Sequence, residues 1–205
     1  GIFKMVLEYN GFTQFKIKKD SSGVWKLDIK EEDLGKPTFA LYTGTESSEE
    51  KEAIRNIYNG NWDENSPITQ ELREISNNNN MGEIIKVLMI TASGSEGINL
   101  RNTRYVHIME PYWHPVRTEQ VIGRARRICS HKELPEALQT VEVFMYLMTF
   151  TQEQKDSDES IELKRKDMGK TVKYPLTSDE YLYEISTIKQ QVNASLTTAI
   201  KETSI

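Results

Sequence analysis

The segment from residue 87 to residue 127 constrains the fold more than any other part of the chain. It opens with an unbroken apolar run, Val-Leu-Met-Ile at 87–90, followed at once by small and polar residues. A run of this kind is typical of a strand that is covered on both faces of a parallel sheet. A second apolar run at 105–109 predicts another strand, and the residues from Pro115 onward have helical character. This order of elements favours an α/β fold.

Residues 91–99 then form the loop at the carboxyl end of the first strand. In an open α/β sheet, ligands bind at this edge because strand ends and helix starts meet there with free backbone N–H groups. Gly94 and Gly97 allow the backbone to bend and to approach a ligand closely. The loop is therefore a candidate binding site.

Three arginines follow in the predicted helix. Arg124 and Arg127 are three residues apart, which places both on one helical face, with Gln120 one turn earlier and Arg126 rotated away. Two guanidinium groups and an amide beside a glycine-rich strand end suit a polyphosphate, because planar donor forks match its oxygens. A glycine-rich loop or a basic helix alone is more often a plain turn or a solvated face. The two together, in this order, are far more specific.

Both segments carry a family resemblance. The sequence TASGSEGINL at 91–100 resembles motif V of superfamily 2 helicases, and QVIGRARR at 120–127 resembles their motif VI, Q-x-x-G-R-x-x-R, at a fitting distance along the chain. The wider sequence, including HPVRTEQVIGRARR and TSDEYLYEIS, is similar to the Swi/Snf-related helicases and nucleoside triphosphatases of large DNA viruses. The resemblance covers most of the chain from Phe39 to about Phe150.

The resemblance implies a RecA-like parallel sheet flanked by helices, in the second helicase domain, which belongs to the P-loop NTPase type but lacks the P-loop. We expect this domain over residues 1–150, a charged flexible segment over 151–177, and a C-terminal helix over 178–205. The helix predicted at 2–9 opens without a cap. We therefore expect the first strand, motif IV in the family, to lie upstream of Gly1, and both chain ends to be cuts.

The resemblance also implies roles for individual residues. Arg127 stands at the position of the arginine finger, Arg124 at that of a second phosphate-facing arginine, and Gln120 would contact the γ-phosphate or the attacking water. Gly97 and Asn99 would bind the nucleotide together with the two arginines. Some relatives carry at position 99 an aspartate that bonds the ribose, so the role of an amide there stays open.

Three further motif V positions would touch nucleic acid. Thr91, Ser93 and Gly94 match positions that contact the nucleic-acid backbone in the family. A hydroxyl and backbone N–H groups can hold a phosphate without reading the sequence, as a translocating motor requires. The resemblance favours DNA over RNA as the partner. Glu96 either orients a motif VI arginine or is a solvated loop charge.

The catalytic motifs that would complete an ATPase are missing. The sequence GKT at 169–171 ends like a P-loop, but Lys164 occupies the required first glycine position, and the Asp-Glu pair at 179–180 begins a polar helix. Phosphoryl transfer needs a phosphate cradle, a magnesium-holding carboxylate, a positioned water and positive charge, of which only the last is visible. We therefore expect ATP and Mg²⁺ to bind mainly through a preceding RecA-like domain, and this chain alone to be inactive.

Composition sets the remaining limits. The 205 residues, 37% hydrophobic and 28% charged, suit one soluble α/β domain with extensions, and no apolar run approaches a membrane span. The net charge of −5 argues against a general nucleic-acid coating protein, but basic residues gather at 117–132 and leave a local site open. The three histidines lack the short spacing of zinc ligands, so no metal site is expected.

The single cysteine, Cys129, cannot form an internal disulfide. This indicates a reducing, intracellular compartment, which for a viral protein would be the host cytoplasm or the virion. We expect the cysteine itself to be a small, partly buried side chain.

Other elements are predicted from local signals. We expect strands at 12–17, 38–42 and 141–148, and helices from a cap at Ser47 to about Tyr58, at 68–75, and from Ser178 to about Ile200. The last helix carries a packing face of Leu182, Ile185, Ile188 and Val192. The four asparagines at 77–80 predict a surface loop whose deletion leaves the melting temperature nearly unchanged.

Together these features predict the C-terminal half of an ATP-dependent helicase or DNA translocase. One alternative is a non-catalytic interaction module that retains the fold, although such a module has no physical need for the paired arginines. A second alternative is a phosphate-binding metabolic enzyme on a doubly wound sheet. No candidate acid, base or nucleophile is grouped with the arginines, which argues against it.

Overall fold

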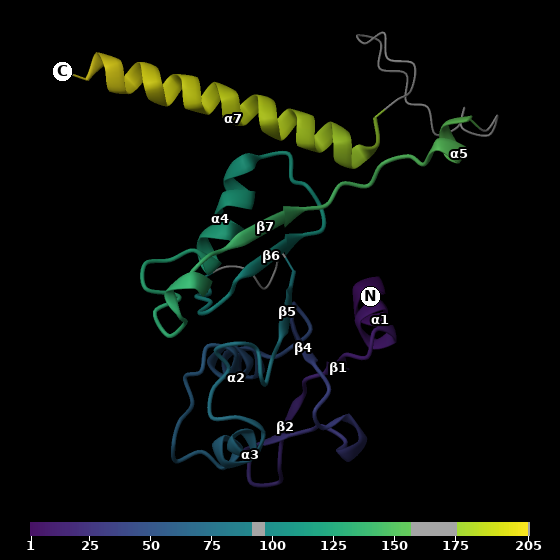
Figure 1. Cartoon of the computed structure of the whole chain (residues 1–205), viewed down its shortest axis with the longest axis vertical. Helices are drawn as coiled ribbons and strands as arrows, with labels where there is room; N and C mark the ends of the chain where they lie inside the picture. Colours follow the sequence, from purple (N-terminus) through teal and green to yellow (C-terminus); the bar gives the residue numbers. More distant parts are fainter. Residues whose placement is uncertain (92–96, 157–175, 205) are drawn as a thin grey trace. The chain divides into compact units, whose positions relative to one another are not determined.

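The computed structural model describes residues 1–91, 97–156 and 176–204. It divides the chain into two units, and Figure 1 follows the chain through both. The first unit comprises Gly1–Arg104 and Arg124–Thr140, and the second comprises Tyr105–Gly123 and Val141–Ile205. The domain limits expected from the sequence, at residues 150 and 177, stay predictions.

A parallel sheet of three strands lies at the centre of the first unit. Its order is β1 (Thr13–Gln14), β4 (Thr38–Tyr42) and β5 (Val87–Ile90), with Thr13 opposite Thr38 and Phe39 opposite Val87. Phe39 and Ala40 of the central strand are fully buried, as the middle of a covered sheet requires. The parallel sheet with its helices confirms the predicted α/β, RecA-like class.

Two helices of the first unit lie where the sequence predicts helices. Helix α2 (Ser48–Tyr58) is capped by Ser47, whose hydroxyl accepts a hydrogen bond from the Glu50 N–H at 3.1 Å. Helix α3 (Pro67–Ile75) begins with proline at its first turn, where no backbone donor is lost. Each helix buries apolar residues at helical spacing, namely Ile54 and Ile57 in α2 and Ile68 and Leu72 in α3.

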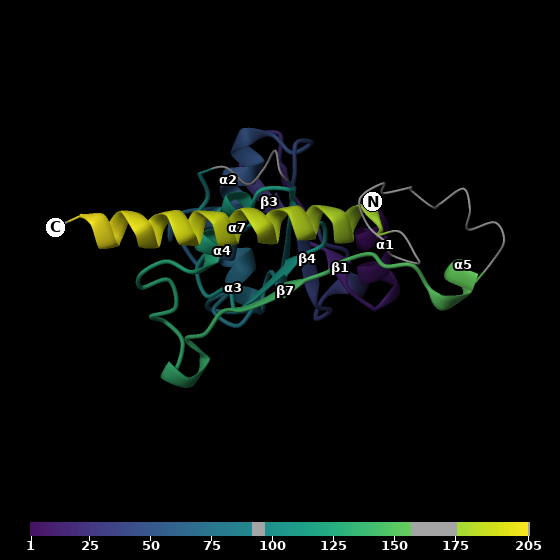
Figure 2. The ribbon, with the colours of Figure 1, turned by 90° about the horizontal axis from the view of Figure 1, so that it is seen from above.

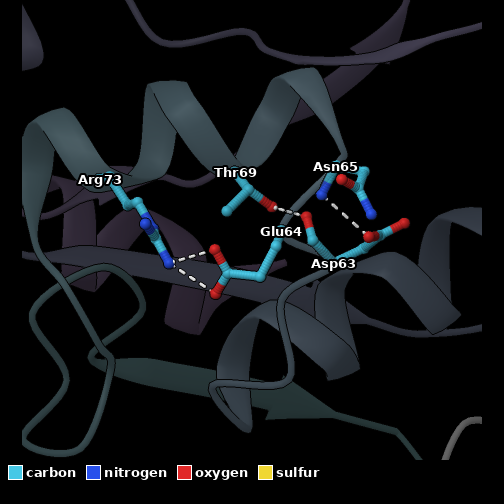
Figure 3. Close-up of polar contacts among 5 residues, drawn as sticks. All are labelled: Asp63, Glu64, Asn65, Thr69 and Arg73. Atoms are coloured by element: carbon cyan, nitrogen blue, oxygen red, sulfur yellow. Dashed lines mark hydrogen bonds and ion pairs between the residues drawn. The ribbon is translucent and has the colours of Figure 1, made fainter.

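The start of α3 is fixed by polar side chains (Figure 3). The Thr69 hydroxyl donates to the Asp63 carbonyl at 2.6 Å, and the Asp63 carboxylate accepts from the Asn65 N–H at 3.0 Å. Arg73, one turn further along the helix, pairs with Glu64. These contacts hold the chain before α3 against its first turns.

The strand predicted at 12–17 is interrupted. Phe15, directly after β1, still donates its N–H to the Phe39 carbonyl at 2.8 Å. Beyond it, β2 (Ile17–Lys19) pairs with β3 (Trp25–Leu27) in an antiparallel hairpin. Asp20 accepts hydrogen bonds from Ser22 and from the Val24 N–H, which hold the pKa of its carboxyl below the usual value. The polar turn is visible in the sequence, but the hairpin around it was not predicted.

One hydrophobic core occupies the first unit. Its buried members come from the sheet, both helices and the segments beside β5; they are Phe15, Ile17, Ala40, Tyr42, Ile54, Ile57, Ile68, Leu72, Ile84, Ile85, Ile98 and Leu100. The core therefore reaches the residues that follow the loop after β5. That connection fixes the backbone on which several candidate site residues lie.

The asparagine run at 77–80 is not a plain surface loop. Asn79 is only 5% exposed, and its Oδ1 accepts hydrogen bonds from the N–H groups of Ile84 and Ile85. Its Nδ2 donates to the carbonyl oxygens of Tyr58 and Ile85. The amide thus satisfies backbone N–H and carbonyl groups that have no partner in a helix or strand. The prediction of a dispensable loop is therefore wrong for Asn79.

The second unit contains a parallel strand pair and the longest helix. Strands β6 (Tyr105–Ile108) and β7 (Glu142–Met145) pair with Tyr105 opposite Glu142. Helix α4 (Pro115–Ala125) runs across the division between the units, and α5 (Gln152–Asp156) is a short helix. Strand β7 is shorter than the predicted 141–148, and most of its side chains are exposed.

Helix α7 (Ser178–Thr203) is the long C-terminal helix in Figure 2. It begins at the predicted residue but with a different cap. Thr177 and Glu180 form a reciprocal capping box, so the cap is Thr177 and not Ser178. The predicted packing face is only partly covered: Ile188 and Val192 are each 52% exposed. No helix among the described residues is both long enough and apolar enough to cross a bilayer.

At the other end of the chain, α1 (Ile2–Tyr9) forms as predicted and stops at Asn10. None of its residues is buried in the structure.

Candidate functional site

The edge of the sheet after β5 is the first part of the candidate site. Thr91 directly follows the strand; its N–H donates to the Tyr42 carbonyl at 3.4 Å, and the residue is exposed. Ser93, Gly94 and Glu96 lie outside the described residues. The described chain resumes at Gly97, which has a φ of +71°, and a Cβ there would meet nothing within 4 Å. Backbone conformation, and not crowding, is therefore the reason for glycine at this position.

Residues 97–101 alternate between the core and the surface. Ile98 and Leu100 are 2% and 7% exposed, whereas Gly97, Asn99 and Arg101 are exposed. The two apolar side chains anchor the segment, and the predicted nucleotide-binding residues Gly97 and Asn99 face outward.

Arg124 lies directly against this segment. Its carbonyl accepts a hydrogen bond from the Leu100 N–H at 3.2 Å, and its Nη1 donates to the Ile98 carbonyl at 3.4 Å. Within the described part of the chain, its Nε is buried without a hydrogen-bond partner. The structure thus brings together the end of the predicted motif V and one arginine of the predicted motif VI.

Arg127 is placed differently from the sequence prediction. Helix α4 ends at Ala125, so Arg126 and Arg127 follow the helix and do not continue its face. The prediction that Arg124 and Arg127 share one helical face is therefore wrong. The side chain of Arg127 is exposed, while Arg124 is half-buried.

A polar turn causes this early end of the helix. The Ser130 hydroxyl donates to the Ala125 carbonyl at 3.0 Å, and the Ser130 N–H donates to the Arg127 carbonyl at 3.1 Å. Cys129 takes a left-handed conformation with φ of 59°. It is exposed, so the prediction of a partly buried cysteine is wrong.

His131 connects this turn to Thr103, which lies just before β6 in the sequence. Its Nε2 lies 2.8 Å from the Thr103 carbonyl, and its Nδ1 lies 2.7 Å from the Ser130 hydroxyl. A carbonyl only accepts, so Nε2 carries the proton in this contact. His131 is a buried structural residue, and it holds the turn that presents Arg127.

Gln120 lies on α4, one helical turn before Arg124 in the sequence, and is exposed. It belongs to the second unit, whereas Arg124 and Arg127 belong to the first. Its relation to the nucleotide stays a prediction.

Asn59 is the residue of this site that sequence reasoning missed. Its side chain is buried at the end of α2 and contacts the backbone of Asn99 and Arg101, each at 2.8 Å. The sequence shows an asparagine followed by glycine where the helix was expected to end, which signals a helix end. A single sequence does not reveal that this asparagine turns inward.

The side chains of this site suit an anion and not a metal ion. Two arginines, one with an orphaned buried Nε, and a glycine at positive φ provide donors and close backbone approach for phosphate oxygens. Within residues 1–91, 97–156 and 176–204, no group of three or more His, Cys, Asp or Glu side chains could hold a metal ion.

Comparison with known proteins gives a consistent family. Residues 63–129 match the family model of the helicase conserved C-terminal domain. The chain is 38% identical over 114 residues to a termination factor NPH-I homolog of African swine fever virus, covering 56% of this chain and 14% of that protein. It is 28% identical over 204 residues to the putative ATP-dependent RNA helicase R350 of Acanthamoeba polyphaga mimivirus, covering 100% and 20%.

A third relative is the nucleoside triphosphatase I of Amsacta moorei entomopoxvirus, with 34% identity over 82 residues, or 40% of this chain and 12% of that protein. The chain therefore matches a fifth or less of the length of these relatives.

Proposed function

Because this chain carries the helicase conserved C-terminal domain of the superfamily 2 type found in large DNA virus proteins, we propose that it is the C-terminal half of an ATP-dependent helicase or translocase. The proposal rests above all on the contact of Arg124 with Ile98 and Leu100, which joins the motif V and motif VI segments in one place. A non-catalytic interaction module that retains this fold does not require a half-buried guanidinium beside Ile98 and Leu100.

In this proposal the arginines supply positive charge to an ATP site shared with a preceding RecA-like domain. A guanidinium stays charged at all relevant pH values, and its planar fork of donors matches a pair of phosphate oxygens. Arg127, which is exposed, acts as the arginine finger, and the anchored Arg124 holds a second phosphate contact. Gln120 orients the γ-phosphate or the attacking water. When bound, ATP supplies the phosphoryl group whose transfer to water drives the cycle.

The remaining positions bind the rest of the nucleotide and the nucleic acid. Gly97 and Asn99 contact the nucleotide, because both face outward beside Arg124. Thr91, Ser93 and Gly94 contact the nucleic-acid backbone, as motif V residues do. The preceding domain provides the site for Mg²⁺, since the described residues of this chain offer no carboxylate cluster.

We propose DNA as the nucleic acid, on the strength of the Swi/Snf-like motifs. The names of the relatives leave this open, because the mimivirus protein is called a putative RNA helicase. Backbone contacts from a hydroxyl and N–H groups do not discriminate by themselves. The choice therefore depends on measurement.

The test is ATP turnover by the full-length protein with duplex DNA, with duplex RNA, and with neither. We expect duplex DNA to stimulate turnover more than duplex RNA, and the 205-residue chain alone to give none. Stronger stimulation by RNA would contradict the choice of DNA. Nucleic-acid binding without any turnover would favour the non-catalytic interaction module instead.

A further inference from the structure

Asn59 links helix α2 to the segment that contacts Arg124. Its Nδ2 donates to the Asn99 carbonyl at 2.8 Å, and its Oδ1 accepts from the Arg101 N–H at 2.8 Å. The residue is 8% exposed, so water competes little for these bonds. One planar amide therefore bridges two backbone groups, one on each side of Leu100.

The end of α2 gives this amide a fixed position. The Asn59 N–H donates to the Arg55 carbonyl at 3.0 Å, which makes Asn59 the last residue of the helical hydrogen-bond pattern. Gly60 follows with a φ of +70° and turns the chain away. Next to it, the hydroxyl of the half-buried Tyr58 pairs with the Thr103 hydroxyl at 2.9 Å. Several hydrogen bonds therefore hold the end of α2, and with it the Asn59 side chain, in place.

Arg124 holds the same segment through different groups. The Leu100 N–H, which lies between the two groups bound by Asn59, donates to the Arg124 carbonyl. The Arg124 guanidinium in turn reaches the Ile98 carbonyl. Moving residues 98–101 would therefore move the hydrogen-bond partners of Arg124.

We propose that Asn59 is a positioning residue of the ATP site, one that fixes residues 98–101 and through them the guanidinium of Arg124. This inference rests on the proposed function. Without the amide, the Asn99 carbonyl and the Arg101 N–H lose their partners, and the segment has to shift to regain hydrogen bonds. A shift of about 1 Å at a catalytic group lowers turnover by roughly 10²-fold.

The experiment measures steady-state ATP turnover by the full-length protein with nucleic acid at saturation. Asn59→Ala should lower kcat by roughly 10-fold to 100-fold while KM for ATP stays within about 3-fold, because a misplaced Arg124 harms the transition state more than binding. Thr69→Ala is the matched control, because Thr69 is also a buried polar residue, it lies on α3 outside the core that holds Ile98 and Leu100, and its hydroxyl contacts the Asp63 carbonyl and not residues 98–101. Under conditions where circular dichroism shows both variants folded, Thr69→Ala should keep the wild-type kcat.

A second variant separates positioning from general destabilisation. In Asn59→Asp, a protonated carboxyl can still donate to Asn99 and accept from Arg101, whereas a carboxylate cannot donate. The kcat of Asn59→Asp relative to Asn59→Ala should therefore rise as the pH is lowered towards the titration range of the carboxyl. A flat ratio would overturn the proposed hydrogen-bond role.

The two levels of the proposal fail in different ways. If Asn59→Ala keeps the kcat of Thr69→Ala while Arg124→Ala loses turnover, the positioning role is wrong and the proposed function stands. If Arg124→Ala turns over ATP like the wild type, the proposed function of this site is wrong.

Discussion

Replacing Asn79 by alanine should destabilise the first unit strongly, although the residue lies in a run of four asparagines. The side chain makes hydrogen bonds to the Ile84 N–H at 2.9 Å, the Ile85 N–H at 2.8 Å, the Tyr58 carbonyl at 2.9 Å and the Ile85 carbonyl at 3.3 Å. Ile84 and Ile85 are among the most deeply buried residues of the chain. Alanine would leave these two N–H groups in an apolar environment without acceptors.

The expected loss follows from the number of groups left unpaired. Each buried donor without a partner costs about 1–3 kcal/mol. Two such donors give about 3–5 kcal/mol once some relaxation and water entry are allowed, which is a large part of the roughly 5–15 kcal/mol that stabilises a typical domain. For a chain of this size, the melting temperature should fall by on the order of 10 °C.

Urea and thermal unfolding followed by circular dichroism measure this loss directly. Asn77→Ala, at an exposed position of the same run, is the matched control and should change stability by about 0.5 kcal/mol or less. Asn79→Asp, which keeps the acceptor for both N–H groups but loses the donor, should lie between the two. Equal stability of Asn79→Ala and Asn77→Ala would refute the reasoning.

Three further outcomes are expected. Gly123→Ala should stabilise helix α4 by up to about 1 kcal/mol in thermal unfolding, because the added Cβ meets nothing within 4 Å. If the preceding RecA-like domain or ATP comes close to Gly123, the same change should lower ATP turnover by the full-length protein, and unchanged turnover would exclude that close approach. Thr91→Ala should reduce nucleic-acid-stimulated turnover more than basal turnover, so equal losses would contradict a backbone contact. Burial raises the pKa of the Glu46 carboxyl, but hydrogen bonds from Thr45 and Thr43 outweigh it and leave the pKa lowered. The stability that Glu46 contributes is thus present above its unfolded pKa near 4.5 and is lost as the pH falls through the lower folded value. The difference in unfolding free energy between wild type and Glu46→Gln should therefore shrink over that pH range. A constant difference would contradict a stabilising role of the Glu46 carboxylate.

Local signals in the sequence predicted most of the helices and the parallel strands. The Ser47 cap and the apolar runs of β4 and β5 act within a few residues, so a single sequence reveals them. The contact between the two motif segments could be expected only from the family resemblance. The hydrogen bonds that make it, from Leu100 and Arg124, involve residues distant in sequence.

The failures of prediction share one physical cause. Asn59 and Asn79 are polar residues of a type that usually lies in exposed turns, yet their amides satisfy buried backbone groups that no strand pairs with. Arg127 leaves the helical face because Ser130 caps α4 at Ala125, and neither helix propensity nor residue spacing reports such a cap. In each case a side-chain hydrogen bond to a backbone group outside the regular pattern of helix or strand decides the local structure.

The most direct test of the central claim is ATP binding and ATP turnover measured separately in the full-length protein with Arg127→Ala. Arg126→Ala, an exposed arginine at the adjacent position, is the control. If Arg127 is the arginine finger, its loss should lower turnover by roughly 10³-fold or more while ATP affinity stays nearly unchanged, and Arg126→Ala should turn over ATP like the wild type. Wild-type turnover by Arg127→Ala would contradict the account.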